Sequence, residues 1–256
     1  MFSTNQRCIY RRNPLGNVIC QLRFPQILSI GTEVPDKFQE AIRDQFPLYT
    51  KKKEVPMLPG MPPAPVQGKE PVINHQFTSA DGVWRVNLTS GFISLSTPRY
   101  TCWEEFAGKL DKPLAAFIKI YNPAFFQRIG LRYVNFISRK TLSLEDMSFR
   151  ELIEPCYLDP LAEEDVAERS CSRCSVDVEM AIRGGCRVKI HAGPGHVNLA
   201  GKQDPEVKYI LDLDLFMPGQ VPVNTAAGSL HTLHAQSYPI FRGAITQELH
   251  NALEPQ

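Results

Sequence analysis

Apolar residues along this chain recur with two periods, one typical of strands and one typical of helices. Every second residue from Val18 to Phe24 is apolar, which predicts a strand with one buried face. The helix predicted next opens at Pro35-Asp36, carries apolar residues at positions 38, 42 and 46, and ends at Pro47. These two elements begin a pattern that the rest of the chain extends.

Two turn signals predict a three-stranded meander in the first half of the chain. Asp81-Gly82 is a strong two-residue hairpin signal and sets Phe77 opposite Val86. The next turn sets Leu88 opposite Ile93 on the same face. Both predicted registers place the apolar residues on the same face of the sheet, and this agreement supports the assignment of all three strands.

The remaining elements repeat the order of the first half. A helix is predicted from Trp103 to Tyr121. After it we expect a strand, a short helix, three strands and a long helical segment, at residues 128–137, 147–154, 175–182, 186–192, 207–216 and 229–253. Pro239 is expected to break the last segment or to start a new helix.

This order of elements predicts an internal duplication. We expect a single α+β domain, residues 1–256, made of two tandem β-α-β-β-β-α units at about 13–126 and 127–256. The sheets would be mainly antiparallel, with helices packed on one face and a pseudo-twofold relation between the units. Matches in the same elements support this prediction, such as Leu22-Arg23-Phe24 with Leu131-Arg132-Tyr133.

Charged residues fix the register of the hairpin in the second half. A three-residue loop, Arg183 to Gly185, keeps the apolar residues of both strands on one face, and its glycines are free to take positive φ. This register pairs Glu179 with Lys189. It also pairs Asp177 with His191, so acidic residues of one strand face basic residues of the next.

Composition narrows the class of protein. The chain has 256 residues, of which 43% are hydrophobic and 21% charged, with a formal net charge of +1, so it has no general attraction to nucleic acid or anionic membranes. No stretch approaches the roughly 20 apolar residues that span a bilayer, and residues 1–12 lack the apolar core of a signal peptide. We expect a cytoplasmic protein with reduced cysteines, among which Cys20 and Cys186 occupy apolar strand positions.

Residues 56–68 contain five prolines, which cannot continue a helix or a central strand. This segment is predicted to be an extended surface loop. The lysines at its start, residues 51–53, are interpreted as a solvated patch.

Two sets of residues have the spacing of partial metal sites. Cys171-Ser-Arg-Cys174 matches half a zinc site, which Cys156, His191 or His196 would have to complete. We favour the alternative, in which the two thiols are unrelated loop residues.

His231 and His234 share one face of the last helical segment. A metal site there would need a carboxylate or a third histidine, and Asp212 and Asp214 on the last strand are the candidate carboxylates. The alternative is that the histidines are polar helix residues and that the aspartates belong to a solvated strand face, which we favour.

The strand at residues 128–137 carries the candidate ligand-binding residues. Tyr133 and Asn135 lie on its apolar face, and Arg132 lies on the opposite face. A buried amide costs free energy unless it is hydrogen-bonded, so Asn135 is either a satisfied core residue or part of a pocket. Arg132 is either an anion contact or a rim residue whose stem covers apolar surface. If the two predicted units pair, these residues mark the seam and a candidate groove.

The run Asn13-Pro14-Leu15 that leads into the first strand, and the run Arg128-Ile-Gly-Leu-Arg-Tyr-Val-Asn135, resemble a sporadically distributed family of uncharacterised prokaryotic proteins of about this length. The resemblance extends over nearly the whole chain. It implies no activity, cofactor or catalytic residue, and the patchy distribution of the family implies an association with mobile or defence genes. The proline-rich segment at 56–68 and the pair Cys171 and Cys174 depart from the family.

Three functions follow as hypotheses. The sequence contains no recognisable nucleophile elbow, phosphate-binding loop or dinucleotide motif. We therefore favour a non-enzymatic binding or accessory protein without a cofactor, whose partner is another protein or a small molecule. The alternatives are an RNA or single-stranded DNA binding protein, which the net charge does not indicate, and a metal-dependent hydrolase. Formation of a homo-oligomer stays open, and no membrane partner is expected.

Overall fold

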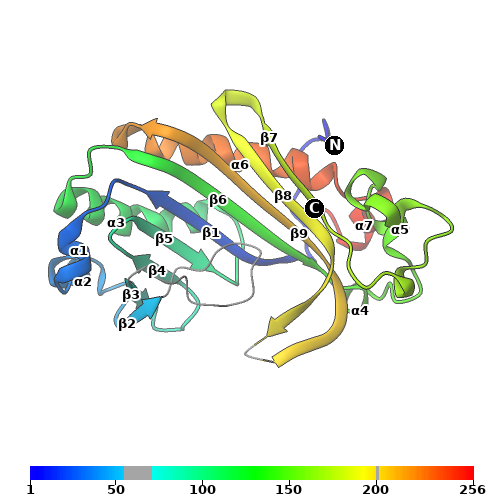
Figure 1. Ribbon diagram of the computed structural model, residues 1–256, viewed down its shortest axis with the longest axis horizontal. Coiled ribbons are helices and arrows are strands. Elements are labelled where there is room, and N and C mark those ends of the chain that lie inside the picture. Colours follow the sequence, from blue (N-terminus) through cyan, green and yellow to red (C-terminus); the bar gives the residue numbers. More distant parts are fainter. Residues whose placement is uncertain (55–70, 200–201) are drawn as a thin grey trace. The chain divides into compact units, whose positions relative to one another are not determined.

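The computed structural model describes residues 1–54, 71–199 and 202–256, so the predicted proline-rich loop lies outside the described residues. The chain is an α+β protein with one open antiparallel sheet of nine strands (Figure 1). The strands are β1 (Leu15–Arg23), β2 (Leu48–Glu54), β3 (Val72–Thr78), β4 (Arg85–Leu88), β5 (Phe92–Thr97), β6 (Phe126–Ile137), β7 (Val176–Ala181), β8 (Arg187–Leu199) and β9 (Lys202–Val221). Their order in the sheet is β2-β3-β4-β5-β1-β6-β9-β8-β7. The predicted α+β class and antiparallel pairing are confirmed.

The chain forms two compact units, which are described one at a time. The hairpin unit comprises residues 1–18, 131–217 and 230–256, and the meander unit comprises residues 19–130 and 218–229. Strands β1, β6 and β9 contribute residues to both units. Each unit is therefore discontinuous in sequence.

The meander unit contains β2 to β5 and the helices α1 (Leu28–Thr32), α2 (Asp36–Ile42) and α3 (Trp103–Tyr121). The apolar row of β1 is buried as predicted, with Cys20 and Leu22 both 0% exposed. Phe38 and Ile42 of α2 are buried as well. The apolar face of the meander and the apolar stripes of its helices thus share one core.

The register of the meander is the one that the sequence predicts. Phe77 lies opposite Val86 and Leu88 lies opposite Ile93. Gly82 takes a φ angle of 74°, which a residue with a side chain rarely adopts, so the Asp81-Gly82 turn depends on its glycine.

Strand β2 is absent from the sequence prediction. It pairs with β3 along its length, from Leu48 opposite Thr78 to Glu54 opposite Val72. Its lysines at 51–53 are exposed on a strand rather than in a loop. An edge strand has little to bury, so its residues do not alternate between apolar and polar, and this removes the signal used to predict a strand.

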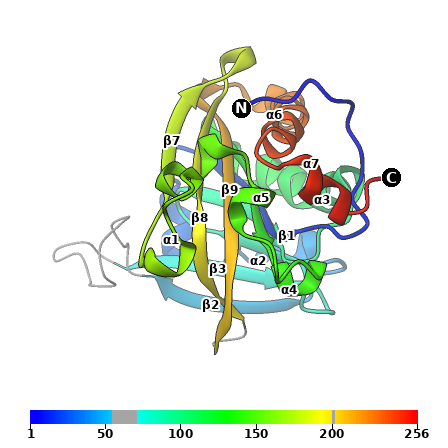
Figure 2. The ribbon, with the colours of Figure 1, turned by 90° about the vertical axis from the view of Figure 1, so that its right-hand side faces the viewer.

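The hairpin unit contains β7, β8 and most of β9, with its two C-terminal helices on one side of these strands (Figure 2). Its helices are α4 (Arg139–Leu142), α5 (Phe149–Leu152), α7 (Gln247–Ala252) and most of α6 (Ala226–Arg242). Residues 211, 213 and 215 of β9 are buried, as are Val188 and Ile190 of β8. Leu233 and Ile240 of α6 are buried too, so the apolar faces of the strands and of α6 form the core of this unit.

The charge-based register of the β7–β8 hairpin is confirmed. Glu179 lies opposite Lys189 and Asp177 lies opposite His191. Both glycines of the Arg183–Gly185 loop have a φ angle of 72°. Strand β9 continues the pattern, because residue 212 lies opposite His191 and residue 214 lies opposite Lys189.

Several predicted boundaries in the hairpin unit were wrong. Strands β8 and β9 extend well beyond the apolar runs that predicted them, as far as Leu199 and Lys202. Helix α6 does not break at Pro239 but continues to Arg242. Burial of Ile240 and Phe241, which are 1% and 9% exposed, stabilises the turn that follows the proline, although the proline itself lacks a backbone donor.

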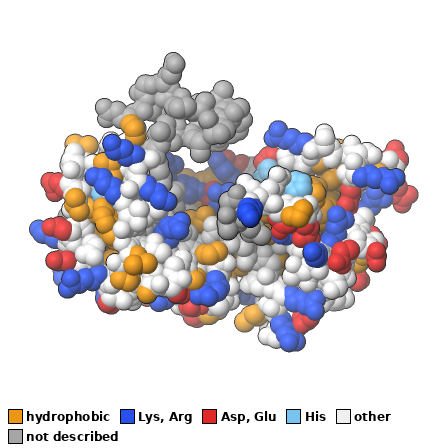
Figure 3. All heavy atoms as spheres, turned by 90° about the horizontal axis from the view of Figure 1, so that it is seen from below, with side chains coloured by type: hydrophobic (Ala, Val, Ile, Leu, Met, Phe, Trp, Pro, Cys, Tyr) orange, Lys and Arg blue, Asp and Glu red, His pale blue; other side chains and the backbone are white. Residues whose placement is uncertain are grey.

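Among the described residues, no helix has the length and apolar composition to cross a membrane. On the face drawn in Figure 3, lysine and arginine side chains are interspersed with aspartate and glutamate side chains. This mixture agrees with the formal net charge of +1.

Candidate functional site

The three predicted ligand residues of β6 contact different partners. The Tyr133 hydroxyl is 2.7 Å from His234 Nδ1, and the Asn135 amide donates to the Leu211 carbonyl at 3.0 Å. Both side chains are buried, at 5% and 3% exposed. Asn135 is therefore hydrogen-bonded within the core.

Arg132 lies on the opposite face of β6 and forms an ion pair. Its Nε donates to the Asp212 carboxylate at 2.8 Å and 3.0 Å, and its Nη2 contacts the same carboxylate. The hydrogen bond to Asp212 raises the pKa of Arg132 above its usual value. The structure thus separates Arg132 from Tyr133 and Asn135 by the thickness of the sheet.

The histidines of α6 also have different surroundings. His231 is exposed, whereas His234 is buried beside Tyr133. Asp212 lies with Arg132 on the other face of the sheet, so it does not face His234. No group of three or more His, Cys, Asp or Glu side chains that could hold a metal ion occurs within residues 1–54, 71–199 and 202–256.

Cys171 and Cys174 line a cleft of about 980 Å³ between the segment at 139–174 and the β8–β9 hairpin. Both are free thiols. The Cys174 thiol donates to the Leu158 carbonyl at 3.5 Å, and burial together with the neighbouring Cys171 raises the pKa of Cys174. A raised pKa keeps the thiol protonated, which is the opposite of what a reactive or metal-binding cysteine needs.

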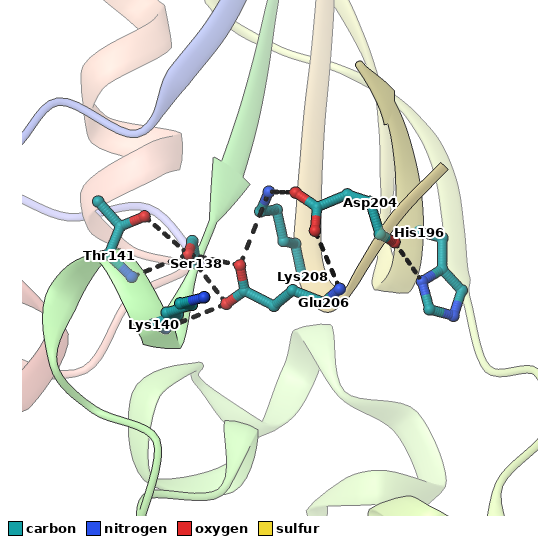
Figure 4. Close-up of polar contacts among 7 residues, drawn as sticks. All are labelled: Ser138, Lys140, Thr141, His196, Asp204, Glu206 and Lys208. Atoms are coloured by element: carbon teal, nitrogen blue, oxygen red, sulfur yellow. Dashed lines mark hydrogen bonds and ion pairs between the residues drawn. The ribbon is translucent and has the colours of Figure 1, made fainter. Parts of the chain in front are cut away.

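A charged cluster connects the lower part of β9 to the start of α4 (Figure 4). The carboxylate of Glu206 accepts hydrogen bonds from the Ser138 hydroxyl at 2.7 Å and from the Lys140 backbone amide at 3.0 Å. Lys208 lies between Glu206, at 3.7 Å, and Asp204, and its hydrogen bond lowers the pKa of Asp204. Ser138 caps α4 and donates to the Glu206 carboxylate, so the cluster fastens β9 to α4.

The polar face of the meander unit carries a row of hydrogen-bonded side chains. The Gln76 amide donates to Asn87 Oδ1 at 3.0 Å, and the Asn87 amide donates to the Ser94 hydroxyl at 3.2 Å. Lys52 and Arg85 are exposed on the same face. Neutral amides dominate this row, so it offers hydrogen bonds more than the phosphate neutralisation that nucleic-acid binding requires.

Strand β7 ends the sheet, and β8 is its only partner among the described strands. The Ile182 amide donates to the Cys186 carbonyl at 2.8 Å, so the even-numbered residues of β7 turn their backbone groups toward β8. The backbone N–H and C=O groups of Asp177, Glu179 and Ala181 therefore turn outward. An edge of this kind is a template for another extended chain.

The apolar row of β7 is incompletely covered. Val178 and Met180 are half-buried. On the same face of β8, Val188 and Ile190 are 0% and 2% exposed. The apolar face of the sheet is thus sealed at β8 and open at β7.

A groove of about 870 Å³ lies at the C-terminal end of this open row. Ile182 and α6 residues, including Pro239 and Ile240, form two of its walls, and residues 2–4 form a third. Figure 2 shows the N-terminal end of the chain between β7 and α6. Since Ile182 belongs to both the row and the groove, the two form one apolar surface beside the free backbone groups.

The outer row of β7 is acidic and is paired with basic side chains of β8. His191 lies 2.7 Å from Asp177, and its hydrogen bond lowers the pKa of Asp177. Arg187 and Lys189 lie 2.9 Å and 3.3 Å from Glu179 and lower its pKa in the same way. Both carboxylates are therefore ionised at neutral pH.

Sequence reasoning placed β7 and its register but missed the edge and its groove. The alternation of β7 resembles that of an inner strand, and the groove needs α6 and residues 2–4 to approach β7. The only sequence signal for an edge was the pair of acidic residues on the outer row, Asp177 and Glu179, because charged side chains are common on edge strands.

No family model matches the chain, and no curated protein matches it either. The resemblance to the sporadically distributed prokaryotic family stays a prediction.

Proposed function

We propose that this chain is a non-enzymatic binding protein that captures an extended segment of another polypeptide by adding it to the edge of β7. The observation that carries the proposal is the combination of outward backbone groups at Asp177, Glu179 and Ala181 with the uncovered apolar row beside them. Strand addition uses both features, because the main chain supplies hydrogen bonds while alternate side chains enter an apolar groove.

The residues with catalytic potential support a binding role. His234 is hydrogen-bonded to Tyr133, Arg132 is paired with Asp212, and Ser138 caps a helix. Each of these side chains has a structural partner in the hairpin unit. We infer an accessory role in a mobile or defence-associated system only from the family resemblance.

We also propose that the chain arose by duplication. Each half runs from a strand through short helices into a meander and then a long helix: β1 to α3, and β6 to α6. In the strand order, the last strand of each meander lies beside the first strand of its half, β5 beside β1 and β9 beside β6. The extra strand β2 and helix α7 are the differences between the halves.

A selection from displayed random peptides of about ten residues, a length that covers β7, tests the binding function. We expect selected peptides to lose binding when alternate backbone amides are N-methylated, because only every second residue of an added strand bonds to the edge. Val178→Lys, which places a charge in the apolar row, should abolish binding. Thr50→Lys, which places the same lysine on the exposed strand β2, is the matched control and should not.

The proposal fails if selection yields no peptide. It also fails if the selected peptides tolerate N-methylation at every position or bind Val178→Lys as tightly as the unchanged chain.

A further inference from the structure

We infer that the segment added to β7 alternates basic and apolar residues. The inference rests on the proposed binding function, since it names the partner of the same edge. It begins from the row formed by Asp177 and Glu179, whose side chains are 68% and 40% exposed.

The basic positions follow from the hydrogen-bonding pattern. Asp177 and Glu179 have outward backbone groups, so each would form a hydrogen-bonded pair with one residue of an added antiparallel strand. The side chains of such a pair lie on the same face, about 5 Å apart at their Cβ atoms. The carboxylates would therefore meet the partner's outer row at close range.

The basic side chains that already contact Asp177 and Glu179 leave one side of each carboxylate open to a further cation. Arg187, Lys189 and His191 all approach from β8, on the inner side of the row. An ionised carboxylate has about four acceptor positions on its two oxygens. A lysine or arginine on an added strand would reach the opposite side of each carboxylate, where it would be nearer to the acids than to the cations of β8.

The apolar positions follow from the other face. The partner residues between the basic ones would lie opposite Val178 and Met180, both half-buried. Beyond them, the groove walls at Ile182, Pro239 and Ile240 can accept a further apolar side chain. An added strand that covered this row would bury Val178 and Met180 as fully as Val188 and Ile190 of β8 are buried already.

A second copy of the chain fits this edge poorly. Antiparallel pairing of β7 with itself about Val178 sets Asp177 of one copy opposite Glu179 of the other. Pairing about Glu179 sets the two Glu179 side chains opposite each other. Like charges in directly opposite positions destabilise a strand pair, so the acidic row disfavours a dimer in both of these registers.

Four synthetic peptides of equal length test the inference: alternating Lys-Val, alternating Glu-Val, alternating Gln-Val, and a block peptide with the Lys-Val composition. Fluorescence polarisation at low salt should rank the alternating Lys-Val peptide above Gln-Val by about two- to thirtyfold, the range expected for two cross-strand charge pairs. Glu-Val should bind weakest, and the block peptide should bind no better than Glu-Val. The advantage of Lys-Val should shrink at about 1 M salt, where charges are screened within about 3 Å.

A charge swap sharpens the test. Glu179→Lys should lower the affinity for the Lys-Val peptide and raise it for Glu-Val, and Glu179→Gln should give intermediate values. If Gln-Val binds as tightly as Lys-Val, with loss on alternate N-methylation, the charge inference is overturned while the binding function stands. If no peptide binds and the chain forms a dimer that Val178→Lys separates, a second copy occupies the edge and both proposals are overturned.

Discussion

Among the described strands, β2 of the meander unit and β7 of the hairpin unit lie at the two edges of the sheet, and their exposed side chains differ. On β2, exposed lysines at three consecutive positions, 51–53, place a charge on both faces of the strand. On β7, Asp177 and Glu179 place charges on one face only, and the apolar face is left open. Charged side chains, and lysine above all, disfavour the addition of another chain to a sheet edge, so the lysines of β2 disfavour it on both faces, whereas the charges of β7 lie on one face only.

The two edges also differ in how they join the core. On β2, the Tyr49 hydroxyl lies 2.9 Å from His75 Nδ1, and His75 Nε2 lies 3.0 Å from the Ile30 carbonyl. This chain of contacts anchors β2 to α1 through a buried side chain. In the described residues of β7 the inward side chains are aliphatic or Met180 and make no such polar anchor. The inward side chains of β7 therefore make only apolar contacts, and these side chains are only half-buried.

The largest expected effect concerns this incomplete burial. Val188→Ala on β8 should lower the free energy of unfolding by about 2 kcal/mol, because it leaves a cavity at a residue that is 0% exposed. Val178→Ala on β7 should cost less than about 1 kcal/mol, because its side chain already contacts solvent. Urea unfolding of both variants measures the difference. Equal losses would mean that the apolar row of β7 is as well covered as that of β8.

A smaller effect should separate the edges by pH. Burial lowers the pKa of His75, with Lys51 acting in the same direction and the hydrogen bond to Ile30 opposing it. Protonation therefore favours the unfolded state, and His75 should cost stability as the pH falls below about 6.5, its unfolded value. The lowered pKa of Asp177 contributes stability above about 3.9, its unfolded value, and loses it only as the pH falls further.

Urea unfolding at pH 7 and pH 5 checks this difference between the edges. The unchanged chain should lose more stability over this interval than His75→Gln, which removes the titrating group at the β2 edge. Identical losses for the two proteins would show that His75 does not link β2 to pH.

The smallest expected effect is that of the β7 surface charges on stability. Glu179→Gln should leave the free energy of unfolding nearly unchanged, because exposed ion pairs contribute little to stability. The same substitution should change peptide binding, where the carboxylate meets an added charge. A large loss of stability in urea unfolding would instead assign Glu179 a structural role and weaken its use as a binding probe.

Local pairing in this protein could be predicted from the sequence. The registers of β3 with β4 and of β7 with β8 depend on turn length and on the face that each side chain occupies, and both are properties of neighbouring residues. Strand β2 was not predicted, because its three consecutive lysines interrupt the alternation of apolar and polar residues. The full lengths of β8 and β9 were not predicted, because the ends of these strands pair polar residues with each other, such as Asn198 with Gln203.

The candidate site depended on the tertiary structure. Arg132, Tyr133 and Asn135 are adjacent in sequence, but Arg132 contacts Asp212 on one face while Tyr133 contacts His234 on the other. Their spacing predicted which face of β6 each side chain occupies. It did not predict the partners Asp212 and His234, because these two residues are distant from β6 in the sequence.

The sequence by itself determined the secondary structure of the β7–β8 hairpin, its acidic and apolar faces and its loop. Only the tertiary structure decided that β7 ends the sheet, that its apolar row is left half-covered, and that Pro239 and Ile240 of α6 face it. The physical reason is the range of the interactions. Alternation and turn chemistry act over a few residues, whereas strand order and groove walls arise from contacts between segments that are distant in sequence.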